Sequence, residues 1–107
     1  MSVEIYDVLN HEEPGRITVP VAAETVFESV WVTALQELNI GRLGNGVWLR
    51  KNELDLLLED FLKVREWVIE HCSVERADSI VHHIDYILEQ LPQQWNRNPD
   101  IEQLWMG

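Results

Sequence analysis

Four side chains between residues 78 and 89 have the chemistry of ligands for a divalent cation. Asp78, His82, Asp85 and Glu89 are spaced so that a helix would place all four on one face. Imidazole and carboxylate groups are ordinary zinc ligands. The same face lies opposite an apolar stripe, and pairing of Asp with His on a solvated helix surface accounts for it without a metal. We therefore favour a solvated helix face, and the sequence indicates no cofactor.

The Gly-rich segment Gly41–Gly46 has the composition of a phosphate-binding loop, with three basic residues in or near it. Its order, G-x-x-G-x-G, matches neither of the familiar nucleotide-binding fingerprints. The helix predicted after it begins with two acidic residues, which would repel a phosphate at the helix N-terminus. The Asn45-Gly46 pair explains the segment better, because it is a strong signal for a two-residue hairpin turn.

Nucleophilic and acid-base catalysis find no better support. Cys72 follows His71, but neighbouring residues of a helix point in different directions, and Cys72 projects onto the apolar side of its helix. We expect a buried structural thiol. No motif sets any pair of the nineteen carboxylates apart as a general acid and base. The sequence therefore predicts a protein that is not an enzyme.

The charge of the chain indicates its partners. Nineteen Asp and Glu against eight Lys and Arg give a formal net charge of −11. Such a surface repels nucleic-acid phosphates and anionic lipid headgroups, and it attracts cationic surfaces. Twelve of the nineteen acids lie from Glu53 onward, opposed by only four basic residues, while the segment 41–51 is locally basic. We expect a basic protein partner, and neither nucleic acid nor a membrane.

Length and composition indicate one globular domain over residues 1–107. The chain is 46% apolar and contains five Trp, which is enough to build a core. The lone Cys72 excludes an intramolecular disulfide framework. Residues 1–9 lack the basic and apolar regions of a secretory signal, and no apolar run approaches the roughly 18 residues of a membrane span. These features predict a cytoplasmic protein.

The first half of the chain predicts two strands, a helix and a second small hairpin. Alternating apolar residues in 3–8 and 17–21 indicate an antiparallel hairpin that turns at Pro14-Gly15, and Pro20 places its second strand at a sheet edge. Residues 23–38 have helical periodicity that stops at Asn39 and Gly41. Residues 41–50 predict a hairpin, or one strand that returns to the first sheet.

The second half predicts two long helices and a short one. The first runs from Asn52 to about His71, and the second is capped by Ser73 and ends before Pro92. Two helices joined by about two residues should pack antiparallel. Asn98-Pro99 then indicates a short C-terminal helix through Trp105. The predicted fold class is α+β: a small antiparallel sheet packed on three main helices and a short C-terminal helix.

The helix over 52–71 carries the candidate partner-binding residues. A helical wheel places an acidic face opposite its predicted core stripe, with Leu56 and Trp67 inside the acidic field. The predicted stripe is Leu54, Leu57, Leu58, Phe61, Leu62, Val68 and Ile69. A large aromatic side chain with a charged rim is typical of a binding hot spot. We favour the alternative, in which Trp67 and Leu56 pack against the C-terminal helix or the 41–50 hairpin. Arg65 projects near the middle of the stripe and should pair with a carboxylate or reach water. The candidate residues are Leu56, Glu59, Asp60, Lys63, Glu66, Trp67 and Glu70.

Two further tryptophans, Trp48 and Trp95, are expected to be partly exposed, each as a lid on the core. In size, acidity and tryptophan content the chain resembles small bacterial immunity proteins that inhibit toxic nucleases, although the resemblance transfers no residues. We therefore expect an immunity or antitoxin-type inhibitor that neutralises a basic toxin, as a monomer or weak homo-oligomer. The alternatives are a nucleic-acid mimic, a structural homo-oligomeric subunit, and a small metal-dependent enzyme.

Overall fold

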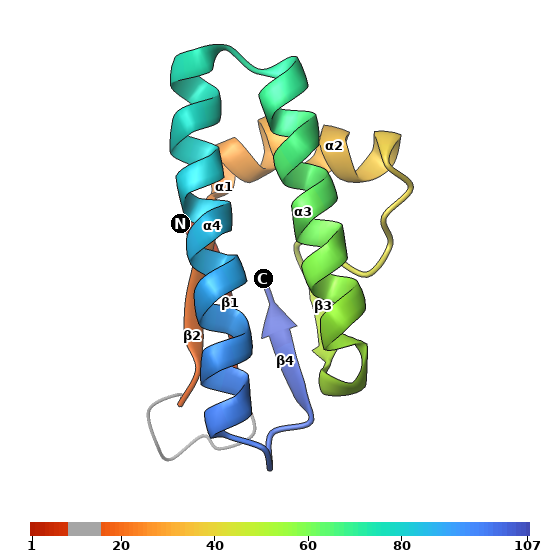
Figure 1. Ribbon diagram of the computed structural model, residues 1–107, viewed down its shortest axis with the longest axis vertical. Coiled ribbons are helices and arrows are strands. Elements are labelled where there is room, and N and C mark those ends of the chain that lie inside the picture. Colours follow the sequence, from red (N-terminus) through yellow and green to blue (C-terminus); the bar gives the residue numbers. More distant parts are fainter. Residues whose placement is uncertain (9–15) are drawn as a thin grey trace.

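The computed structural model describes residues 1–8 and 16–107, so the turn predicted at Pro14-Gly15 lies outside the described residues. Figure 1 shows a sheet with two long helices in front of it and a shorter helical segment across its upper end. In chain order the elements are β1 (Ser2–Tyr6), β2 (Thr18–Ala23), α1 (Glu24–Val26), a π-helical turn (Phe27–Trp31), α2 (Val32–Glu37), β3 (Val47–Arg50), a 3-10 turn (Lys51–Glu53), α3 (Leu54–His71), α4 (Val74–Arg97) and β4 (Gln103–Met106). The α+β class is confirmed.

The four strands form one antiparallel sheet in the order β2-β1-β4-β3. The predicted pairing of the first two strands is confirmed, as is the position of Pro20 in an edge strand, where a missing N–H costs no ladder bond to a second neighbour. Val3, Ile5, Val19 and Val21 alternate with more exposed residues and point into the core. The sheet therefore has one buried face and one face of mixed polarity.

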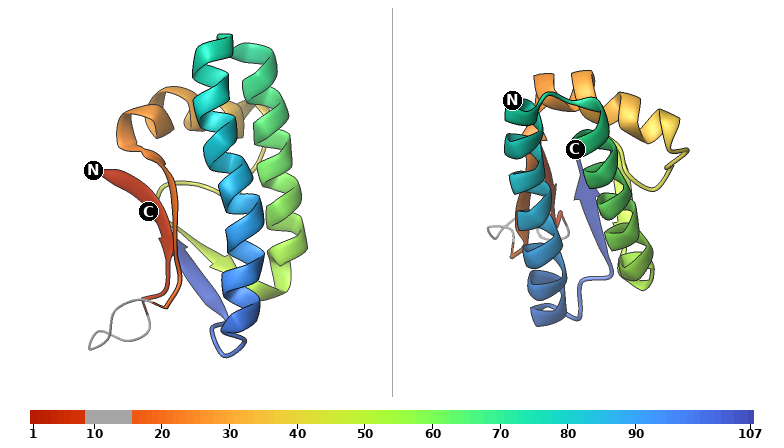
Figure 2. Two further views of the ribbon diagram at one scale, coloured as in Figure 1. Left: turned by 60° about the vertical axis from the view of Figure 1, so that its left-hand side comes forward. Right: turned by 45° about the horizontal axis from the view of Figure 1, so that its top comes forward.

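The long helices α3 and α4 lie antiparallel on one face of the sheet (Figure 2, left). The link between them is two residues long, and the Ser73 side chain accepts a hydrogen bond from the Arg76 amide, which confirms the predicted cap. Arg65 of α3 pairs with Asp85 of α4, with 2.7 Å between Nε and Oδ1. This hydrogen bond raises the pKa of the Arg65 guanidinium. The odd position of Arg65 on its helix is thus explained by a link between the two helices.

The helical segment from Glu24 to Glu37 closes one end of the core. Its central turn is π-helical, and the rings of Phe27 and Trp31 stack with 5.6 Å between centroids. Trp31 also meets the edge of Phe61 from α3. The segment ends at Asn39, which has a φ of 56°, while the Ile40 amide donates to the Leu35 carbonyl. The predicted stop is confirmed as a left-handed helix cap.

Of the two alternatives predicted for residues 41–50, the single strand that returns to the first sheet is confirmed: Val47–Arg50 is strand β3, which pairs with β4, and the segment forms no hairpin of its own. The prediction for the C-terminal segment needs correction. The segment after Asn98-Pro99 is not a short helix, because Gln103–Met106 is strand β4. β4 lies between β1 and β3, so hydrogen bonds on both of its sides outweigh the local helix-start signal.

The end of α4 also differs from the prediction. Pro92 does not end the helix, which continues to Arg97. The extra turns bury Trp95 completely, and its Nε1 donates a 2.6 Å hydrogen bond to the Ile101 carbonyl. Burial of a tryptophan whose N–H is hydrogen-bonded offsets the helical backbone hydrogen bond that Pro92 cannot donate. The expectation that Trp95 is partly exposed is therefore wrong, whereas Trp48, 45% exposed, is confirmed as partly exposed.

Candidate interaction surfaces

The structure divides the candidate binding residues of α3 between three surroundings. Glu59, Glu66 and Glu70 are exposed, as are Lys63 and Leu56. Asp60 does not belong with them, because it is 1% exposed. The buried stripe of α3 is Leu57, Asp60, Phe61, Val64 and Val68. The helix is thus rotated relative to the predicted stripe, and Leu62 and Ile69, assigned to the core, are about half exposed.

Buried Asp60 is held by Arg42 from the loop after α2. Its carboxylate accepts from Arg42 Nε at 2.9 Å and from Nη2 at 3.3 Å, in a two-pronged contact. The hydrogen bond raises the pKa of the Arg42 guanidinium. Arg42 is one of the basic residues that gave the Gly-rich segment the composition of a phosphate-binding loop. In the structure it instead binds Asp60 and so holds that segment against α3.

Trp67 is half-buried against the core and makes contacts within the chain. Its Nε1 donates to Glu37 Oε2 of α2 at 3.0 Å. Its ring stacks on His71, with 4.3 Å between ring centroids and 11° between the planes. Of the two roles considered for Trp67, the structure favours packing, although against α2 rather than the C-terminal segment.

The candidate metal ligands on α4 are not gathered into a site. Within residues 1–8 and 16–107, no group of three His, Cys, Asp or Glu side chains is placed to hold a metal ion. Asp85 is paired with Arg65, and the rings of His82 and His83 lie edge to face, with 6.3 Å between their centroids. Cys72 is a free thiol and half-buried, rather than fully buried as expected.

The outer surface of α3 and α4 carries an acidic helical face. We define it by the exposed carboxylates of Asp55, Glu59, Glu66, Glu70, Glu75, Asp78 and Glu89. In the described part of the chain none of these seven makes an ion pair; the three ion pairs there use Asp60, Asp85 and Asp100. Leu62 and Ile69, 48% and 52% exposed, lie within the face. The exposed acidic residues predicted on α3 are thus present, and Leu62 and Ile69, which the sequence assigned to the core, are exposed beside them, as is Leu56.

The second surface was not predicted from the sequence: it is the sheet face that α3 and α4 leave uncovered (Figure 2, left). Tyr6, Trp105 and Trp48 are direct partners across β1, β4 and β3, and they form an aromatic row on this face. Trp48 and Trp105 meet edge to face, with 5.0 Å between ring centroids. The period-two pattern of Gln103–Met106 and Val47–Arg50 was the signal that could have revealed it.

The backbone around Trp105 is shaped to its ring. A Cβ on Gly107 would lie 2.6 Å from Trp105 Nε1, and one on Gly46 would lie 3.9 Å from Cζ2. Gly46 also has a φ of 105°. The indole therefore lies over Gly107, a position where a side chain would collide with the ring.

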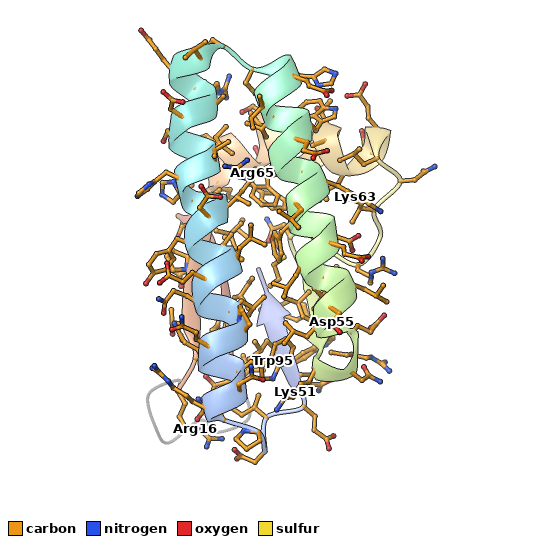
Figure 3. The ribbon with its side chains drawn as sticks, viewed as in Figure 1. Arg16, Lys51, Asp55, Lys63, Arg65 and Trp95 are labelled. Carbon is orange, nitrogen blue, oxygen red and sulfur yellow. The ribbon has the colours of Figure 1, made fainter. Side chains whose placement is uncertain are left out.

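Two clefts complete the surface of the described residues. One, of about 480 Å³, lies between α2 and the loop after it and is lined mainly by apolar residues such as Phe27, Leu35 and Ile40. The other, of about 820 Å³, lies beside the start of β4 and is lined by charges of both signs, Arg50 and Lys51 with Asp100 and Glu102. Figure 3 labels Lys51 near the lower end of the molecule, where this second cleft opens. Neither cleft brings together a nucleophile and a base.

Comparison with protein-family models, with curated proteins and with solved structures gives no match. No helix in residues 1–8 and 16–107 has the length and apolarity needed to cross a bilayer. The acidic helical face and the uncovered sheet face are therefore the two candidate interaction surfaces of the described residues.

Proposed function

We propose that this chain is a cytoplasmic inhibitor of the immunity or antitoxin type, which neutralises a basic protein toxin by binding it with the acidic helical face. One observation carries the proposal. Seven exposed carboxylates on two adjacent helices make no ion pair among the described residues, and they outnumber the exposed Lys63 that lies between Glu59 and Glu66. Their mutual repulsion costs stability that a basic partner would recover.

The geometry of α3 suits a long, shallow contact. Asp55, Glu59, Glu66 and Glu70 follow one side of the helix with Leu62 in the gap, so the stripe is about 22 Å long at 1.5 Å per residue. A row of carboxylates of this length can steer a basic partner during encounter and fix its register. A nuclease is a fitting target, since the groove that binds nucleic acid is itself basic.

Apolar anchors within the field would then hold the complex. Leu62 and Ile69 are exposed apolar side chains that lie between the carboxylates along α3, and Tyr86 of α4 is 44% exposed. Buried apolar contacts with a charged rim are the usual anatomy of a specific interface. Trp67 has no part in this proposal, because its indole N–H is used by Glu37.

The test is binding to the product of the neighbouring reading frame, since an inhibitor is commonly encoded beside its target. We expect a complex whose association rate falls steeply as salt is raised. Glu59→Gln/Glu66→Gln should weaken it at least about tenfold, by removing two carboxylates from the interface. Glu28→Gln/Glu102→Gln is the matched control, because both residues are exposed outside α3 and α4 and the charge change is the same.

Two results would overturn the proposal. Equal affinities of the two double variants would show that the acidic helical face is not the interface. Failure to bind the neighbouring product, together with recovery of no basic protein on the immobilised chain, would remove the inhibitor function itself. Leu62→Ala/Ile69→Ala adds a check on the anchors, since exposed residues contribute little to folding and their loss should show only in the complex.

A further inference from the structure

The uncovered sheet face combines the aromatic row with two opposite charges. Thr18 and Pro20 of β2, Glu4 of β1, Arg50 of β3 and Gln103 of β4 share this face with the row, by the alternation of the strands. Glu4 and Arg50 are its two charged strand residues, so their formal charges cancel. In a chain of net charge −11, the described strand residues of this face therefore have no net charge.

The two charges are placed symmetrically about Trp105. Glu4 exchanges both backbone hydrogen bonds with Gly107, so it lies one strand to one side and two residues beyond Trp105. Arg50 pairs with Gln103, so it lies one strand to the other side and two residues before Trp105. Tyr6 and Trp48 lie directly opposite Trp105 on its two neighbouring strands. The face therefore has opposite charges at two opposite corners and aromatic rings between them.

We propose that a second copy of this chain docks on this face, with the two sheets packed face to face around a twofold axis through Trp105. An axis lying in the interface plane that exchanges the two corners sets Glu4 of each copy against Arg50 of the other. A twofold interface requires such self-complementarity, because each contact occurs twice. The twofold axis must be perpendicular to the line that joins the two charged corners. With strands about 4.8 Å apart and a rise of about 3.3 Å per residue, this direction makes the strands of the two sheets cross at a steep angle, near the orthogonal class of sheet packing.

A second copy fits this face better than a partner of strong charge. The face offers no net charge to steer a basic or an acidic protein, whereas it brings the acidic helical faces of two copies to opposite sides of the dimer. Four strands of about five residues give roughly 300 Å² in plan, well below the roughly 800 Å² per partner of a standard interface. The dimer is therefore weak, with a dissociation constant between about 10 µM and 1 mM.

Sedimentation analysis of the full chain from about 10 µM to 1 mM tests the proposal. The wild type should show a reversible monomer-dimer equilibrium. Glu4→Arg should weaken the dimer at least about tenfold by placing like charges together, although it lowers the net charge of each chain from −11 to −9, since −11 + 2 = −9. Repulsion between two acidic chains predicts the opposite change in affinity, because the less negative Glu4→Arg chains would repel each other less. Glu28→Arg makes the same charge change off the sheet and should leave the dimer equal or tighter.

The charge swap Glu4→Arg/Arg50→Glu should restore the wild-type dimer to within about threefold, because it re-forms both pairs with reversed sign. Trp105→Ala should abolish dimerisation, with circular dichroism showing that the monomer remains folded. A wild type that stays monomeric throughout the range would overturn the proposal, as would a Glu4→Arg variant that dimerises as tightly as Glu28→Arg. These measurements need no toxin, so their failure leaves the proposed function unaffected, and the reverse also holds.

Discussion

Arg42 lies 41% exposed on a surface loop, yet its Nε contacts the Oδ2 of Asp60, a carboxylate 2% exposed within the core side of α3, at 2.9 Å. A buried carboxylate is tolerated only while a cation and hydrogen bonds compensate its lost hydration. The pair therefore fastens the loop after α2 to α3, and loss of Arg42 would leave the Asp60 carboxylate buried without a cation.

This contact predicts an unequal response to substitution. Arg42→Met should lower the urea midpoint markedly, because it leaves the Asp60 carboxylate buried without a partner. The double variant Arg42→Met/Asp60→Leu should be more stable than Arg42→Met alone, since it removes the uncompensated charge. A double variant that is less stable than the single one would show that Asp60 makes a favourable contribution independent of Arg42.

The two fully buried tryptophans should respond differently to loss of the indole N–H. Trp95 donates from Nε1 to the Ile101 carbonyl, whereas Trp31 Nε1 is buried without a hydrogen-bond partner in the described residues. Trp95→Phe should therefore lower the free energy of unfolding by about 1 to 3 kcal/mol more than Trp31→Phe, since only the former leaves an unsatisfied acceptor. Chemical denaturation of both variants measures the difference, and equal losses would contradict it.

Pro92 lies inside α4 and cannot donate to the carbonyl of Leu88. Pro92→Ala should raise the free energy of unfolding by about 1 to 2 kcal/mol, because the gain in helix propensity exceeds the added freedom of the unfolded chain. Thermal and urea unfolding measure it. A lower midpoint would mean that ring contacts of the half-buried proline outweigh the restored hydrogen bond.

Stability should depend on pH through Asp100. A hydrogen bond from Arg16, at 2.8 Å between Nη2 and Oδ2, lowers the pKa of Asp100 below its usual 3.8. The lowered pKa means that the carboxylate stabilises the folded state above about pH 4, and that this contribution is lost as the pH falls through the folded-state value. Asp100→Asn should be slightly less stable than wild type at pH 7, by a small amount since both groups are exposed. The gap between the urea midpoints of the two proteins should narrow as the pH falls below about 4, and a gap that does not change with pH would rule out the carboxylate as its cause.

The sequence was informative where local pattern and tertiary environment agree. The alternation of Val3 and Ile5 and the helical period of α3 and α4 each correspond to a real buried face, so these elements could be predicted. β4 was missed, because the helix-start signal of Asn98-Pro99 outweighed the short period-two pattern of Gln103–Met106, whose strand partners are distant in sequence. Non-local pairing is invisible to a local rule.

The candidate site shows the same limit within one helix. Leu62 and Ile69 were assigned to the core stripe of α3 because they are apolar. Asp60 was assigned to the solvent-exposed face because a carboxylate is rarely buried. The distant Arg42 that makes its burial tolerable could not be found by periodicity. The acidic field was predicted because charge is additive along a face, whereas the apolar residues within it depend on a rotation of the helix by less than one residue.

The position of β4 has a consequence for how the chain is made. The innermost pairing of the sheet joins Ile5 to Met106, so the strand that completes it is also the last element of the described chain. During synthesis, β1, β2 and β3 can collapse around α3 and α4 but cannot form a continuous sheet until Gln103–Met106 have left the ribosome. Contacts of such long sequence separation slow folding. Until that moment the emerging chain exposes two unpaired strand edges, which chaperones recognise and which other nascent chains can join.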